Sequence, residues 1–241
     1  MKRVLWIAVG LLSLIGVVVV VRRTVVLIGA SAEGLDEGFA THRILTFAHI
    51  IPALLFILLG PWQFVRGIPS RHPRFHRISG RIFVASGLIV GTTALIMSPQ
   101  MAVGGANETA ATMLFAILFL FSLVTAFVKI RQRKVAQHRE WMIRAYAIGL
   151  AVATIRPIVG VFFATQRLTH LTPHEFFGIA FWLGFTLQTI AAEVYINYAR
   201  ASQQTVRVPQ AAIRKPLRAA ESEARLPLPT QRSQSKTPRV K

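Results

Sequence analysis

The chain has 241 residues, of which 53% are hydrophobic and 15% are charged, and its formal net charge is +19. A soluble domain carries about 25% charged residues, so this composition indicates a membrane protein. The absence of cysteine excludes disulfides, thiolate metal sites and cysteine nucleophiles. Nucleic-acid binding is not expected, because the basic residues lie at the ends of apolar segments and in the C-terminal region rather than on one face.

Six apolar stretches are long enough to cross a membrane as helices, which takes about 20 residues each. They lie at residues 4–21, 44–65, 78–98, 111–130, 141–163 and 176–198. Between the third and the fourth, Pro, Gly and Asn residues end one helix and begin the next. Pro173 begins the sixth, at a position where the missing N–H costs nothing. The sequence therefore predicts an all-α, polytopic transmembrane bundle of six helices.

The first segment also resembles a signal peptide. Lys2 and Arg3 precede an apolar run, and the small residues 30–32 follow it, as they would at a cleavage site. The run is longer than usual for a signal peptide, and Arg22 and Arg23 separate it from the small residues. We therefore favour a retained helix, and cleavage would leave the other five helices oriented as before.

Basic residues alternate between the connecting segments. Residues 66–81 hold five Arg and no acid, and residues 129–144 hold six Lys or Arg and one acid. Residues 101–112 hold no Lys or Arg, and residues 164–175 hold a single Arg. The segment at residues 22–43 is less decisive, because its three Arg are balanced by three acids. Since Lys and Arg are retained on the cytoplasmic side, this pattern predicts six crossings with both termini in the cytoplasm.

The composition changes after residue 199. Residues 200–241 contain five prolines and are rich in Lys and Arg, without a sustained apolar periodicity. Such a segment cannot bury enough apolar surface to become ordered, so we predict a disordered cytoplasmic tail. We expect this tail and the basic loops to associate with anionic lipid headgroups, although the tail could equally have no specific role. The expected organisation is a first helix and outer loop at residues 1–43, a five-helix domain at residues 44–199, and the tail.

Polar side chains within the spans are costly, about 2.5–3.5 kcal/mol for a charged group at the centre of a helix. At about 1.5 Å of rise per residue, His49 and Arg156 lie at a similar depth in the outer leaflet. His42 lies at the rim above them, and Gln63 shares a helical stripe with His49. These four residues form a candidate cofactor site. The alternative is a buried hydrogen-bonded pair of His49 and Arg156 that only fixes packing.

A second polar group lies at the predicted cytoplasmic ends of the helices. Its members are His76, Arg77, Arg81, His138, Arg139, Arg144 and Glu193. We expect Glu193, near the end of the last helix, to pair with Arg81 or Arg144. Arginines at such positions usually anchor topology, so a structural role is favoured for this group.

Metal and haem sites have less support. His72 and His76, like His170 and His174, have the i, i+4 spacing that can seat a metal, but neither pair has the Glu of an HExxH motif. We therefore predict no metal site. A haem held between helices needs facing ligands, and only His49 is clearly within the membrane. No catalytic residues are assigned, because the sequence lacks a phosphate-binding glycine loop, G-x-S-x-G and a set of paired acids.

Several motifs occur together in the membrane segments. They are Gly60-Pro61-x-Gln63-Phe64, His76-Arg77-x-x-Gly80-Arg81 and His138-Arg139-x-Trp141-Met142-x-Arg144. With His49, Arg156 and Glu193, they resemble a bacterial family of predicted membrane proteins, the domain of unknown function 2306, over residues 44–200. Gln188 departs from the family pattern, in which we expect Asn. The resemblance implies a bacterial inner-membrane protein and no particular activity.

Three functions are compatible with these features. In the first, His49 and Arg156 hold a haem b or a quinone headgroup in a redox membrane protein. In the second, the chain is a small transporter, with Pro52 and Pro157 breaking their helices close to the polar residues. In the third, it is an accessory subunit that docks a protein partner through Arg77 and Arg139. The sequence favours the first slightly and does not decide whether the chain is an enzyme.

Overall fold

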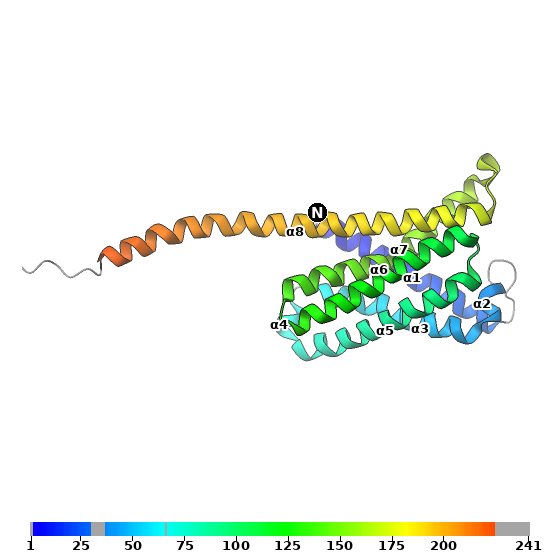
Figure 1. Ribbon diagram of the computed structural model, residues 1–241, viewed down its shortest axis with the longest axis horizontal. Coiled ribbons are helices and arrows are strands. Elements are labelled where there is room, and N and C mark those ends of the chain that lie inside the picture. Colours follow the sequence, from blue (N-terminus) through cyan, green and yellow to red (C-terminus); the bar gives the residue numbers. More distant parts are fainter. Residues whose placement is uncertain (1, 30–36, 66, 225–241) are drawn as a thin grey trace, which may run out of the picture. The chain divides into compact units, whose positions relative to one another are not determined.

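The computed structural model describes residues 2–29, 37–65 and 67–224, and this part of the chain is folded into helices joined by short turns (Figure 1). Its six long helices are α1 (Lys2–Ile28), α3 (Arg43–Phe64), α5 (Pro73–Met101), α6 (Gly105–Arg131), α7 (Val135–Thr169) and α8 (Pro173–Ala224). Each contains a segment long and apolar enough to cross a membrane. The predicted all-α bundle with six spans is therefore confirmed. Arg66 and the possible cleavage site at residues 30–32 lie outside the described residues.

The long helices other than α3 are longer than the apolar segments that predict them. The helix α5 begins at Pro73, five residues before the predicted segment, and α7 extends beyond the predicted 141–163 at both ends. The reason is that the hydrocarbon thickness limits the apolar part of a helix and not its polar ends. One consequence concerns Glu108, which lies in the first turn of α6 rather than in a loop.

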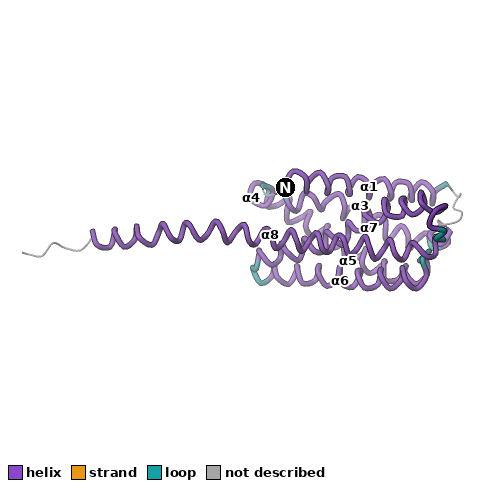
Figure 2. The backbone as a smooth tube through the Cα atoms, turned by 90° about the horizontal axis from the view of Figure 1, so that it is seen from above, coloured by secondary structure: helices purple, strands orange, loops and turns teal. Residues whose placement is uncertain are grey.

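Residues 2–196 form one compact unit, in which neighbouring helices pack side by side (Figures 1 and 2). The helix α3 packs against α5, α5 against α6, and α6 against α7, while α1 contacts α3 and α7. The short helices α2 (Glu37–Thr41) and α4 (Ile68–Arg71) lie at opposite ends of this unit. We call the end with α2 the neutral end. The end with α4, where the Arg-rich connections lie, is the basic end.

Large hydrophobic side chains cover much of the outside of the helices. Ile44 is 89% exposed, Leu168 83% and Ile28 72%. A soluble protein rarely leaves such an extensive apolar surface in contact with water. Lipid hydrocarbon is the surrounding that this surface fits, in agreement with the composition.

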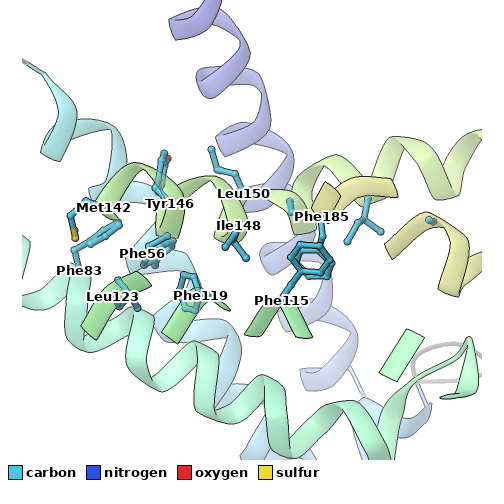
Figure 3. Close-up of a cluster of buried hydrophobic side chains, with 14 of the residues drawn as sticks. Phe56, Phe83, Phe115, Phe119, Leu123, Met142, Tyr146, Ile148, Leu150 and Phe185 are labelled. Atoms are coloured by element: carbon cyan, nitrogen blue, oxygen red, sulfur yellow. The ribbon is translucent and has the colours of Figure 1, made fainter. Parts of the chain in front are cut away.

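The core of the unit is built around Phe56 of α3 (Figure 3). Its ring stacks on that of Phe83 of α5, with 4.2 Å between centroids, and meets the edge of Phe119 of α6 at 5.4 Å. Glycine makes room for it, because a Cβ on Gly87 or Gly149 would touch the Phe56 ring. The helices α3, α5 and α7 approach closely at this level because the glycines of α5 and α7 lie opposite the large Phe56 side chain.

The helix α8 continues through residues 200–224, where the composition predicts a disordered tail. This stretch is rich in Ala, Gln, Glu and Arg, which have high helix propensity. From residue 197 onward the chain forms a second unit. Residues 225–241 lie outside the described part of the chain.

The packing of α3 against α7 predicts a stability difference between two glycine substitutions. In Gly60→Ala the new methyl group would meet the buried ring of Tyr146, whereas at Gly160 nothing lies within 4 Å of an added Cβ. We expect Gly60→Ala to lower the free energy of unfolding by about 1–3 kcal/mol, as overpacking does. Gly160→Ala, the matched control, is expected to be neutral or slightly stabilising. Unfolding in mixed SDS micelles measures both, and equal stability of the two variants would contradict this packing.

Candidate functional site

A cavity of about 230 Å³ lies among the helices, in the half of the bundle nearer the neutral end. Its walls are mostly apolar and aromatic, and they include Phe56, Phe115, Phe119 and Phe185 (Figure 3). A few polar side chains interrupt these walls. They are Arg23, His49, Ser98, Glu108, Thr112 and Arg156. An apolar cavity with a few convergent polar groups is the usual form of a small-molecule site.

His49 is held by α5. Its Nδ1 lies 2.8 Å from Thr93 Oγ1, and the Thr93 hydroxyl donates to the Ile89 carbonyl at 2.7 Å. A hydroxyl has one proton, and when Thr93 donates it to the Ile89 carbonyl, Oγ1 accepts from Nδ1–H of His49. In that arrangement the neutral imidazole carries its proton on Nδ1 and keeps a lone pair on Nε2.

Glu108 and Arg156 bring opposite charges to the cavity walls. The buried Glu108 carboxylate accepts a hydrogen bond from the Gly104 backbone N–H at 2.6 Å, which fixes it to the turn before α6. Arg156 of α7 lies within electrostatic range of this carboxylate. The next residue, Pro157, has no N–H to donate to the carbonyl of Ala153. Ala153 is another residue of the cavity wall. The wall thus combines guanidinium donors with a carboxylate acceptor.

Four of the polar wall residues do not figure among the candidates predicted from the sequence, and two of these four, Arg23 and Glu108, are ionisable. Arg23 reaches the cavity from α1, and its guanidinium carbon lies 3.7 Å from the centroid of the Phe39 ring. The sequence indicates only a basic pair flanking the first span. Glu108 is predicted to lie in a loop. The feature of the sequence that could have pointed to Glu108 is that it is the one acidic residue among residues 101–112.

Of the four predicted cofactor residues, His49 and Arg156 line the cavity and the other two do not. His42 is exposed, and its Nδ1 lies 3.3 Å from the Gly38 carbonyl. Gln63 lies at the basic end of α3, where its amide nitrogen donates to Ser79 Oγ at 2.8 Å. It therefore joins α3 to α5 rather than facing His49.

The predicted inner group contains one ion pair between helices. Arg144 Nε donates to Glu193 Oε1, Nη2 donates to Oε2 at 3.0 Å, and the guanidinium lies over the Trp141 ring at 4.5 Å. Of the two expected partners of Glu193, Arg144 makes this pair. Arg81 is exposed.

The other members of this group are spread over the basic end. His138 Nδ1 lies 2.8 Å from the Ala126 carbonyl, and His76 is within electrostatic range of His138. Arg77 is exposed and Arg139 is half-buried. Within residues 2–29, 37–65 and 67–224, no three His, Asp or Glu side chains gather in a way that could hold a metal ion.

A family model described as "Predicted membrane protein (DUF2306)" matches residues 46–196, more than half of the chain. The match covers most of α3, all of α5, α6 and α7, and α8 up to the end of the compact unit. The helix α1, which contributes Arg23 to the cavity, lies outside it. No curated protein and no solved structure matches the chain.

The Arg144–Glu193 pair predicts a measurable coupling between α7 and α8. The two side chains are 19% and 41% exposed, so solvent screens the pair in part. We expect Arg144→Gln and Glu193→Gln each to destabilise the fold, and the double variant to lose less than the sum, with a coupling of about 1 kcal/mol. The exposed Arg81→Gln is the matched control and should be neutral. If the effects of the two single substitutions on the free energy of unfolding add up to that of the double variant, the ion pair contributes nothing to stability.

Proposed function

The chain belongs to the DUF2306 family of predicted membrane proteins, and we propose that it binds the ring headgroup of a quinone or quinol in the cavity that His49 and Arg156 line. One observation carries the proposal. A single apolar cavity presents an imidazole whose orientation is fixed by Thr93, together with an arginine. This combination suits a flat ring that carries oxygen atoms and an apolar tail.

The hydrogen-bonding pattern assigns a role to each side chain. The guanidinium of Arg156 has five N–H donors, so it can donate to a ring oxygen and keep its other interactions. His49 Nε2, which has a lone pair, accepts from a hydroxyl group. Phe56, Phe115 and Phe119 offer aromatic surface against which the ring can pack.

We infer the tautomer of His49 with its proton on Nδ1, and this tautomer favours the reduced form of the ligand. A quinol has hydroxyl groups that donate to Nε2, whereas a quinone has only acceptor oxygens. With Nδ1–H committed to Thr93 Oγ1, His49 has no N–H to give to a quinone. We therefore propose quinol as the preferred ligand.

The same geometry supports haem less well. A haem held between two helices needs facing axial ligands, and among the described residues His49 is the only histidine that lines the cavity. The volume of about 230 Å³ also lies below the range of roughly 300–1,000 Å³ for larger ligands, which favours a small ring.

Transport has no specific support from the helices. Pro52 and Pro157 lie inside α3 and α7, which continue through them as single helices. The expectation that they break these helices is therefore wrong. Docking of a protein partner through Arg77 and Arg139 stays a prediction.

The charge distribution supports an orientation in a bacterial inner membrane, with both termini in the cytoplasm. The connections that hold the arginine-rich segments lie at the basic end. Facing that end toward the cytoplasm satisfies the preference of Lys and Arg for the cytoplasmic side. The cavity then lies in the outer half of the membrane.

Reporter fusions test this orientation. Alkaline phosphatase is active outside the cytoplasm and green fluorescent protein folds inside it, so phosphatase joined after Gly104 should be active. Fluorescent protein joined after Gln132 should fluoresce, because this residue follows α6 at the basic end. The reverse pattern at both positions would overturn the orientation.

The ligand proposal predicts a redox preference that depends on His49. A short-chain ubiquinol analogue should bind the purified full-length protein about tenfold more tightly than its quinone, since only the quinol supplies the hydrogen bond to Nε2. His49→Leu should remove this preference, and Arg156→Gln should weaken both forms. His42→Gln, a histidine away from the cavity, should change neither. Isothermal titration in mild detergent measures all four proteins.

Two results would contradict the proposal. One is wild-type affinity for both forms in His49→Leu. The other is tighter binding of the quinone than of the quinol by the unmodified protein.

A further inference from the structure

A groove of about 400 Å³ lies at the basic end, where α3 ends and α5 begins, far along the helices from the cavity. It is lined by Trp62, Ile68, His72 and Phe75. Two of these aromatic side chains are well exposed, Trp62 at 55% and Phe75 at 48%. Large aromatic rings at the end of a membrane helix are typical of the level of the lipid headgroups.

Positive charge adjoins this groove. Arg71 ends α4 and Arg74 stands in the first turn of α5, each next in sequence to a groove residue, His72 or Phe75. Both arginines are exposed, and residues 66–81 contain no acid. Two exposed arginines therefore flank the groove residues in the sequence, in a connection that itself contains no carboxylate.

We propose that this groove is a binding site for one anionic diacyl phospholipid. The guanidinium groups of Arg71 and Arg74 bind the phosphate, since the planar fork of arginine matches two phosphate oxygens. An acyl chain lies along Trp62 and Phe75. Basic pockets at the ends of transmembrane helices recognise anionic headgroups in this way. A free phosphate ion would leave the aromatic wall unused, which is why the ligand is a lipid.

The second basic connection provides a natural comparison. Arg131, the last residue of α6, and Lys134, which precedes α7, are exposed and carry the same charge as Arg71 and Arg74. Neither lies next in sequence to a residue of the groove. If charge alone attracted lipid, the two connections would behave alike. The proposal requires the two connections to differ in how much they contribute to lipid binding.

Native mass spectrometry of the full-length protein tests the site. The protein is released from mild detergent after incubation with phosphatidylglycerol or with phosphatidylcholine, and the bound lipid is counted. We expect one retained phosphatidylglycerol for each chain and little phosphatidylcholine. The double variant Arg71→Gln with Arg74→Gln should retain phosphatidylglycerol at least tenfold less, since each charge near a headgroup contributes about fivefold. Arg131→Gln with Lys134→Gln should behave as the unmodified protein.

A third variant separates the groove from the charge. Trp62→Ala with Phe75→Ala removes the exposed aromatic wall and keeps every arginine, and it should also lower retention. The proposal is overturned if the two charge variants lose lipid equally, because the attraction is then diffuse. It is also overturned if the aromatic variant retains lipid as before, or if inorganic phosphate displaces the lipid completely.

Discussion

Hydrocarbon offers no hydrogen bonds, so every polar side chain within a span must find its partner inside the protein. Several hydroxyl groups bond to carbonyls of their own helix, as Ser122 does to Leu118, and other polar side chains find partners on neighbouring helices. His49 meets Thr93 and Gln63 meets Ser79 between α3 and α5. Gln188 donates to Thr154 between α7 and α8 at 2.7 Å, and the Arg144–Glu193 pair joins the same two helices. These few contacts fix the relative positions of helices whose apolar surfaces alone would pack in several ways.

The sequence predicts the spans and the basic end because hydropathy and charge are properties of each segment. It predicts the site only in part. The depth of a residue follows from the helical rise, and this is enough to place His49 and Arg156 at one level. The helical stripe shared by His49 and Gln63 shows that they lie on one face of the helix, but it does not show which helix packs against that face. In the structure Gln63 contacts Ser79 of α5. Arg23 and Glu108 reach the cavity through the packing of α1 and through an extra turn of α6, which no local pattern encodes.

The motifs that resemble the family divide into two groups in the structure. Gly60, Gln63 and Gly80 lie at close contacts between helices, where Gly60 admits the Tyr146 ring and Gly80 admits the Gln63 amide. Arg144 joins α7 to α8. These residues explain how the bundle is held together in its basic half. His49 and Arg156, by contrast, line the cavity, so they are the residues through which a ligand would be recognised.

The central claim is that Thr93 holds His49 with its proton on Nδ1 and leaves Nε2 as the acceptor for a ligand. Nitrogen-15 NMR of histidine-labelled protein in lipid tests it most directly, with the His49 signals assigned by their loss in His49→Leu. The account predicts a protonated Nδ1 and an unprotonated Nε2 in the unmodified protein. It also predicts a mixture of tautomers in Thr93→Val, where the acceptor hydroxyl is gone. A proton on Nε2 in the unmodified protein, or no change in Thr93→Val, would contradict it.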